Sequence, residues 1–299
     1  MGKRIILFLL TNLAVIVVAS FILNLFNVTP YLNQKGLNYQ SLFIFALIFG
    51  FAGAFISLLL SKTMAIYGMG VKRIENPRNQ YESQLMATIQ NLAQKANIGM
   101  PEVGIYDSPE PNAFATGWNK NKALVAVSTG LLQNMNPEEL NGVLGHEISH
   151  ISNGDMVTMT LLQGVLNTFV IFFARIAAFV VAQFLQRDEE NSSISTMTYW
   201  LVSMAFEIVF GILASIVVLA FSRWREFRAD AGSSRLVSKS SMIAALNRLQ
   251  QLTAKGVPED NRAPSLATFK ISDQKSRFGR LFASHPPLEE RIAALERVK

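Results

Sequence analysis

Two histidines and a glutamate in the segment His146–His150 have the types and spacing of a metal-dependent hydrolytic site. The segment reads His-Glu-x-x-His, and residues four apart on an α-helix lie on one face, one turn apart. Two imidazoles at this spacing can bind one metal ion, and Glu147 can reach a water molecule on that ion. The pattern is typical of zinc proteases, in which the histidines bind the metal and the glutamate is the general base.

The motif needs a helix, and the residues before it carry a helix start signal. Asn136 can cap the helix, Pro137 suits the first helical position, and Glu139 can close a capping box. The chain contains no cysteine, so any metal must be bound by His, Asp or Glu.

The chain as a whole has the composition of a membrane protein. Of its 299 residues, 16% are charged and 50% are hydrophobic, whereas a typical soluble domain has about 25% charged residues. The apolar residues form four runs, at 5–26, 36–61, 156–186 and 197–222. Since about 20 residues span a hydrocarbon core, we predict two transmembrane hairpins, although the second could lie partly over the cytoplasmic leaflet. The first run is too long for a signal peptide and lacks a cleavage site.

These runs divide the chain into four expected segments. They are an N-terminal transmembrane hairpin (1–61), a protease segment with a small sheet and the motif helix (62–155), a second hairpin (156–222) and a helical segment (223–299). Short β-type runs at 103–106, 112–116 and 124–128 predict the sheet. Helical periodicity predicts helices at 81–97, at about 240–255 and around Leu288, Ile292 and Leu295.

The basic residues predict the orientation in the membrane. Lys and Arg gather at the N-terminus and after the second and fourth runs, whereas the loops inside the two hairpins hold one each, Lys35 and Arg187. The positive-inside rule therefore places both termini and the motif helix in the cytoplasm. This distribution accounts for the net charge of +6, and we expect no nucleic-acid partner.

A catalytic zinc usually has three protein ligands and one open position. An extended motif with glycine at 153 and histidine at 156 is excluded, because the chain has Asn153 and Met156. The third ligand is then His285 or an acid. Glu226 and Asp230 share a helix face, so Glu226 could bind the metal while Asp230 accepts a hydrogen bond from a ligating imidazole. A solvated charge cluster is the alternative, because three arginines surround Glu226.

Several motifs together resemble the HtpX family of membrane-bound zinc proteases, among the Ste24-like M48 peptidases. The resemblance covers nearly the whole chain and rests on six segments: His146–His150, Glu226–Gly232, Asn112–Gly117, Val125–Leu132, Asn153–Met156 and Ser284–Leu288. It implies one Zn2+ per chain, with Glu226 as the third ligand and Asp230 as the partner of a ligating histidine. It further implies quality-control proteolysis of misfolded membrane proteins at the cytoplasmic side of a bacterial inner membrane.

The expected fold is therefore mainly α: a polytopic membrane protein with four transmembrane helices and a cytosolic α+β zincin-type metalloprotease domain carrying a small β-sheet. Protein substrates, chiefly membrane proteins, and the lipid bilayer are the expected partners. Two other functions stay open, a Ste24-like processing peptidase with a narrow substrate and a membrane scaffold with a structural metal. Glu147 argues against the scaffold, because a structural site has no use for a base beside the metal.

Three further groups are candidate functional residues. The strand predicted at 112–116 could lie at the edge of the sheet and bind substrate by main-chain hydrogen bonds, through Asn112, Ala113, Phe114 and Ala115. His285 could cap the last helix, or reach the metal site as an oxyanion donor. Arg175 and Glu207 each lie 16 residues from Asn191 in the second hairpin, so they could form an intramembrane ion pair. A polar patch that admits substrate from the bilayer is the alternative.

Overall fold

The computed structural model describes residues 38–185, 196–256 and 281–297. The described residues form two compact units. The described parts of Met1–Ile56 and Thr158–Val218 form one unit, called the membrane unit below, and the described parts of Ser57–Val157 and Leu219–Lys299 form the other, called the protease unit. Each unit is thus assembled from two separate stretches of the chain.

The protease unit contains a mixed sheet of four strands in the order β1-β2-β4-β3. β2 (Glu102–Tyr106) and β4 (Leu124–Ser128) are parallel, while β3 (Ala113–Thr116) pairs with β4 in the antiparallel direction. β1 (Lys72–Arg73) pairs with β2 and is a short edge strand that the sequence did not predict. Every residue of β4 is buried, as a central strand covered on both faces requires.

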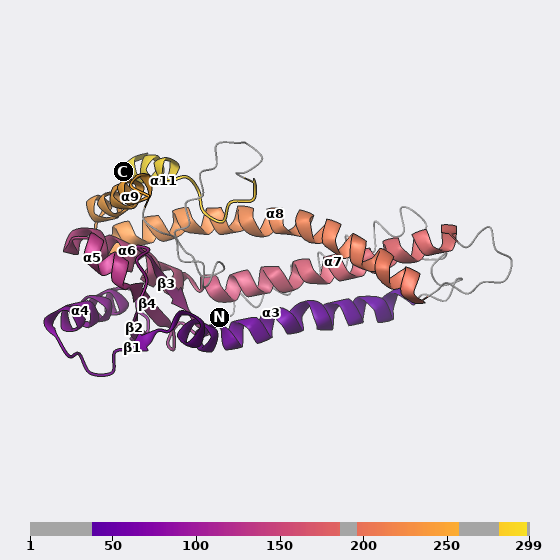
Figure 1. Ribbon diagram of the computed structural model, residues 1–299, viewed down its shortest axis with the longest axis horizontal. Helices are drawn as coiled ribbons and strands as arrows, with labels where there is room; N and C mark the ends of the chain where they lie inside the picture. Colours follow the sequence, from indigo (N-terminus) through magenta and orange to yellow (C-terminus); the bar gives the residue numbers. More distant parts are fainter. Residues whose placement is uncertain (1–37, 186–195, 257–280, 298–299) are drawn as a thin grey trace. The chain divides into compact units, whose positions relative to one another are not determined.

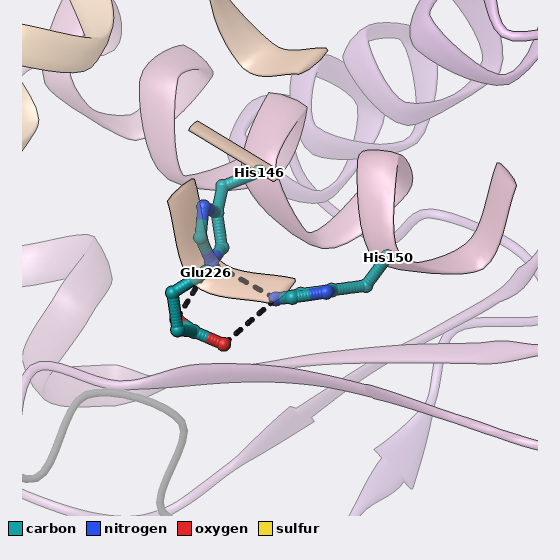
Figure 2. A group of neighbouring side chains, drawn as sticks. All are labelled: His146, His150 and Glu226. Carbon is teal, nitrogen blue, oxygen red and sulfur yellow. Dashed lines mark hydrogen bonds and ion pairs between the residues drawn. The ribbon is translucent and has the colours of Figure 1, made fainter. Parts of the chain in front are cut away.

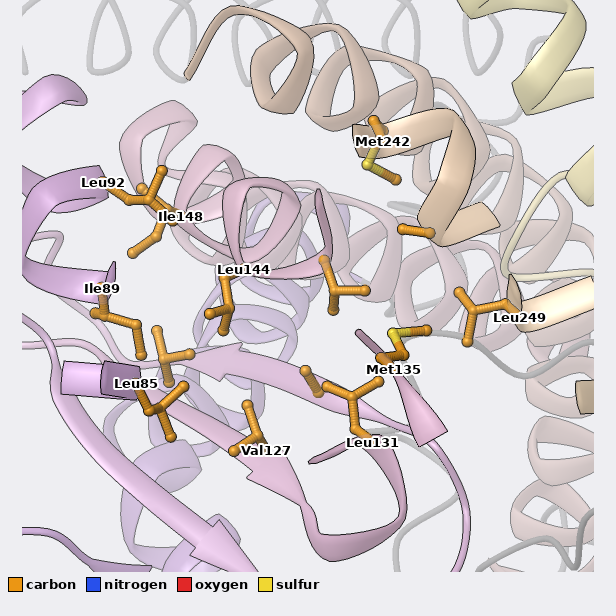
Figure 3. Close-up of a cluster of buried hydrophobic side chains, with 14 of the residues drawn as sticks. Leu85, Ile89, Leu92, Val127, Leu131, Met135, Leu144, Ile148, Met242 and Leu249 are labelled. Carbon is orange, nitrogen blue, oxygen red and sulfur yellow. The ribbon is translucent and has the colours of Figure 1, made fainter. Parts of the chain in front are cut away.

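Besides the long helices that are described below, the described part of the protease unit contains five shorter helices (Figure 1). They are α4 (Gln80–Lys95), α5 (Thr129–Asn134), α6 (Pro137–Asn153), α9 (Lys239–Ala254) and α11 (Leu288–Arg297). α6 lies at the centre, because it packs against α4, α9 and β3. Leu144 and Ile148 on α6 are fully buried in a core shared with Ile89 of α4 and Met242 of α9, as Figure 3 shows. This core packs α6 between α4, α9 and β3.

The predicted capping box of α6 is confirmed. The Asn136 side chain accepts a hydrogen bond from the backbone N–H of Glu139 at 3.0 Å, and the Asn136 N–H donates to the Glu139 carboxylate at 2.9 Å. The helix ends at Gly154, whose φ of +65° is the left-handed conformation that glycine adopts readily. The next helix begins immediately, at Asp155.

Three described helices are long and apolar enough to cross a membrane: α3 (Tyr39–Met69), α7 (Asp155–Leu185) and α8 (Thr196–Leu236). The first apolar run, at 5–26, lies outside the described residues, so the expected count of four is not reached among those described. α3 continues eight residues beyond the apolar run that ends at 61, and α8 continues fourteen residues beyond the run that ends at 222, because charged residues end an apolar run without ending a helix.

In the membrane unit, aromatic and small residues pack α3 against α7. The rings of Phe43 and Phe172 meet edge to face with centroids 5.6 Å apart. Gly50 allows close approach, since a Cβ there would lie 2.6 Å from the backbone nitrogen of Thr168.

Arg175 and Glu207, the residues predicted to form an ion pair in the second hairpin, lie within ion-pair distance. Their Nη2 and Oε1 atoms are 3.5 Å apart.

Candidate metal centre

Two glycines bring α6 and α8 into close contact. A Cβ at Gly145 would lie 2.7 Å from Ser233 Oγ, and a Cβ at Gly232 would lie 2.5 Å from Ser149 Oγ. No side chain larger than hydrogen fits at either position without a shift. Because the two helices are this close, the histidines of α6 and the acids of α8 reach each other directly.

His146, His150 and Glu226 converge on one point in the protein interior (Figure 2). The two Nε2 atoms are 3.0 Å apart. The Glu226 carboxylate faces both, with Oε2 at 3.4 Å from His146 Nε2 and Oε1 at 3.3 Å from His150 Nε2. One potential ligand atom from each residue lies within 4.8 Å of the other two, and all three residues are buried.

This donor set fits a catalytic metal ion. Two imidazole nitrogens and a carboxylate oxygen are ligands that zinc prefers, and three protein ligands leave a coordination position open for water. The geometry also brings Glu226, the acid 76 positions beyond His150, to the motif helix. The ligand roles stay a prediction, and convergence of the three side chains supports it.

The Nδ1 atom of each histidine, which faces away from the metal position, contacts an aspartate. His146 Nδ1 lies 2.8 Å from Asp230 Oδ1, and His150 Nδ1 lies 2.7 Å from Asp155 Oδ2. A proton on Nδ1 that is shared with a carboxylate leaves the Nε2 lone pair directed at the metal position. Asp230 stands where the sequence placed it, whereas Asp155 was not predicted as a site residue.

The acids around the site change the pKa of both histidines. Burial lowers the pKa of His150, but the negative charge of Glu226 and the hydrogen bond to Asp155 outweigh burial and raise this pKa to about 9. Burial also opposes protonation of His146, and its hydrogen bonds to Asp230 and Glu226 raise its pKa. The acids therefore hold positive charge at the centre, whether it is a proton or a metal ion.

Glu147 is buried beside the two histidines. Burial raises the pKa of its carboxyl group, although the nearby histidines oppose this change. Its Oε1 atom is buried and has no hydrogen-bond partner among the residues that the structure describes. A carboxylate with a raised pKa and an uncommitted oxygen suits a general base.

Arg291 is a second site residue that the sequence did not predict. Its side chain is 1% exposed. It donates two hydrogen bonds to Asp230, and its Nη1 atom lies 3.8 Å from Glu226 Oε2. A signal was present, because Arg291 falls three residues after Leu288 and four before Leu295, on the apolar face of the last helix. An arginine at a core position has a buried partner. For Asp155 the signals were its place after the Asn-Gly helix stop and its position within Asn153–Met156, a segment that carries the family resemblance.

His285 lies at the site. Its Nδ1 atom is 2.9 Å from Glu226 Oε2, and its side chain is 8% exposed. Of the two interpretations offered by the sequence, proximity to the metal position therefore matches the geometry. A role as oxyanion donor stays a prediction.

The strand predicted to bind substrate is β3, an edge strand that packs against the motif helix. Phe114 is 2% exposed and belongs to the core on one face of the sheet, while Ala113 is fully buried against α6. These two side chains are committed to packing. Substrate binding along the backbone of this strand stays a prediction. Asn112 precedes β3, and its buried Oδ1 has no hydrogen-bond partner in the described part of the chain.

Comparison with known proteins gives the family. The model of Peptidase family M48 matches residues 79–299. The chain belongs to peptidase family M48. Among M48 relatives, the Protease HtpX homolog of Methylacidiphilum infernorum is 51% identical over 100% of this chain and 99% of its own length. Protease HtpX of Idiomarina loihiensis is 52% identical over 98% of this chain and 99% of its own length. This M48 protein is therefore a metalloprotease of the HtpX group and a multi-pass membrane protein.

A solved structure extends the comparison to the fold. The crystal structure of Ste24p from S. mikatae matches 97% of this chain and 67% of its own, with a TM-score of 0.64 and 18% identity. At that identity the likeness shows a shared fold and nothing about substrate. The mainly helical architecture with a small sheet is thus common to distant proteins with this fold.

Proposed function

We propose that this M48 protein is a zinc-dependent endopeptidase of a bacterial inner membrane, and that it degrades misfolded or damaged membrane proteins from the cytoplasmic side. The observation that carries the proposal is the convergence of His146, His150 and Glu226 beside the buried base Glu147. A structural metal site would need no such base.

One Zn2+ bound by His146, His150 and Glu226 would supply a Lewis acid that acidifies water and polarises the scissile carbonyl group. Glu147 Oε1 accepts a proton from the attacking water and later donates it to the leaving amine. Asp230 and Asp155 keep the proton of each imidazole on Nδ1, so that both Nε2 atoms stay available as ligands.

The substrate is held as an added strand. β3 is an edge of the sheet and packs on α6, so a peptide paired with it would run beside the motif helix. Main-chain hydrogen bonds give affinity without selecting side chains. This mode suits a protease that acts on many unfolded segments, and it supports a quality-control role over a narrow processing role.

The distribution of charge supports the cytoplasmic location. Lys72, Arg73 and Arg78 follow α3, while Arg223, Arg225 and Arg228 follow the last apolar run of α8. Positive residues beside membrane spans are retained on the cytoplasmic side. Both clusters belong to the protease unit, which carries the candidate metal centre.

The test compares three purified proteins in detergent, with zinc, on an unfolded protein substrate. The Glu147→Gln variant keeps the shape of the side chain and removes the base, so the rate should fall by about 10²- to 10⁴-fold. Glu75→Gln, at an exposed glutamate, is the matched control and should cleave as the wild type does. A chelator should abolish cleavage, and added zinc should restore it.

Other outcomes would change the assignment. Equal cleavage by wild type and Glu147→Gln, or no cleavage by the wild type at any metal load, would contradict the endopeptidase proposal. Zinc bound without proteolysis would favour a scaffold with a structural metal. Cleavage of one peptide at one position, with no attack on unfolded proteins, would favour the processing peptidase.

A further inference from the structure

The part of α8 that follows its apolar run presents an exposed aromatic ring beside basic groups. Trp224 is 54% exposed. Its ring centroid lies 5.4 Å from that of Phe221, and the Arg228 guanidinium carbon lies 5.7 Å from the Trp224 ring. Tryptophan and arginine at a membrane exit favour the headgroup layer, where an apolar ring and a charged tip are both solvated.

A second exposed apolar pair is fixed to the same stretch of helix. Leu281 and Phe282 are 39% and 49% exposed. Arg223 Nη1 donates to the carbonyl oxygens of Leu281 at 3.3 Å and Ala283 at 2.7 Å. The arginine thus holds the two apolar side chains on α8, one residue from Trp224 in sequence.

The position of Trp224 along α8 identifies what covers this surface. Trp200, which is 49% exposed, lies 24 residues earlier in the same helix, or about 36 Å at 1.5 Å per residue. A bilayer has a hydrocarbon core of about 30 Å and a total thickness of about 40–45 Å. Two exposed tryptophans at this spacing match the two headgroup layers, and the residues between them belong to the candidate span Met197–Leu236.

We propose that Trp224, Arg228 and the Leu281–Phe282 pair form an interfacial anchor that lies in the headgroup layer of the bilayer and determines where substrates are cut. The anchor binds the lipid–water interface. It is continuous with the membrane-spanning run of α8, and Arg228 complements the phosphates of anionic lipids.

The anchor places the candidate metal centre close to the membrane surface. Glu226 lies two residues beyond Trp224, about 3 Å along the helix axis. His285 lies three residues beyond Phe282. The headgroup layer is about 5–8 Å thick on each side, and an extended chain covers about 3.5 Å per residue. These lengths correspond to about three or four extended residues, so cleavage should fall close to the point where a substrate's transmembrane segment leaves the bilayer, and within about the first ten residues after it. This inference rests on the proposed proteolytic function and specifies its substrates as juxtamembrane segments.

The three tryptophans of the chain, Trp118, Trp200 and Trp224, allow a test that does not depend on proteolysis. Full-length variants that each keep one tryptophan, with phenylalanine at the other two positions, are placed in lipid nanodiscs. Nitroxides on the headgroup or near the top of the acyl chain should quench Trp224 strongly. Trp118, 45% exposed in the polar loop after β3, should respond to aqueous acrylamide instead. Quenching of Trp224 by acrylamide to the same extent as Trp118 would overturn the anchor.

A second measurement tests the consequence for cleavage. The substrate is one transmembrane segment followed by a long unstructured polar linker, and the cut positions are mapped by mass spectrometry. The wild type should cut within the first ten or so linker residues. Trp224→Ala should cleave this substrate at least threefold more slowly while cleaving a soluble unfolded protein at the wild-type rate, and Trp118→Ala should match the wild type on both.

The two measurements separate the possible failures. Wild-type cuts spread evenly along the linker, or equal rates for Trp224→Ala and Trp118→Ala, would overturn the effect of the anchor on cleavage. If the wild type cleaves neither substrate, the proposed function fails, whereas the quenching result still decides whether Trp224 lies in the headgroup layer.

Discussion

Arg291 donates two hydrogen bonds to the carboxylate of Asp230, from Nε to Oδ2 at 2.8 Å and from Nη2 to Oδ1 at 2.6 Å. Asp230 in turn lies 2.8 Å from His146 Nδ1. A chain of contacts therefore runs from the last described helix, α11, to the candidate metal ligand on α6. The guanidinium also balances the negative charge that two acids, Asp230 and Glu226, bring to a buried site.

Replacing Arg291 should weaken metal binding. Arg291→Met leaves Asp230 without its bidentate partner, so the orientation of His146 is no longer fixed, and changes in such supporting contacts typically cost 10- to 100-fold in metal affinity. Arg291→Lys should lose less, because it keeps the charge without the paired geometry. Zinc affinity is measured by competition with a chromogenic chelator.

The control for Arg291 is Arg297→Met, at an exposed arginine on the same helix. Its affinity should equal that of the wild type. Wild-type affinity in Arg291→Met would show that the two hydrogen bonds to Asp230 contribute to packing alone.

Asp155 should support zinc binding by His150 in the way that Asp230 supports zinc binding by His146. Asp155→Asn replaces an acceptor with a group that also donates, so the His150 proton is no longer held on Nδ1. We expect zinc affinity to fall by about 10- to 100-fold, with the helical circular dichroism unchanged. Asp107→Asn, at an exposed aspartate, serves as the matched substitution, and an equal loss in both variants would refute a specific role for Asp155.

Metal binding should release protons, and its affinity should depend on pH. The pKa of His150 is raised to about 9 because the negative charge of Glu226 and the hydrogen bond to Asp155 outweigh burial. In chelator-stripped protein His150 is then protonated at neutral pH, and a metal ion must displace that proton. Affinity should rise with pH up to about 9 and level off above it.

Calorimetry in two buffers checks the release of protons. At pH 7 the observed heats in PIPES and in MOPS, two buffers that bind zinc weakly, should differ, since each buffer takes up the released protons with its own ionisation enthalpy. Identical heats would mean that no proton leaves, and that the imidazoles are neutral before the metal binds.

The chemistry of the site was largely readable from the sequence, because a helical repeat places His146 and His150 together whatever the surrounding fold. The start of α6 was readable for the same reason, since Asn136 and Glu139 act within one turn. Arg291 was missed because its role depends on a contact with Asp230, which is 61 residues away in the sequence. Asp155 is only five residues from His150, and it was missed because the turn at Gly154 that brings it back to the imidazole does not follow from helical spacing. Hydropathy alone did not show that α8 continues to Leu236, because hydropathy marks where the chain turns polar and not where a helix stops.

The close approach of α6 and α8 predicts the effect of one substitution and names a second substitution that should reverse this effect. A Cβ at Gly232 would lie 2.5 Å from Ser149 Oγ and 2.7 Å from Ser149 Cβ, but 3.9 Å from Ser149 Cα. Gly232→Ala should therefore push the helices apart, at about 1–3 kcal/mol, and move Glu226 away from the histidines. The thermal midpoint and zinc affinity should both fall. Ser149→Gly in the same chain removes the obstructing atoms and should restore affinity. Gly211→Ala, on the same helix where a Cβ meets nothing within 4 Å, should bind zinc normally. A loss that Ser149→Gly leaves uncorrected would mean that something other than the spacing of these helices governs the metal centre.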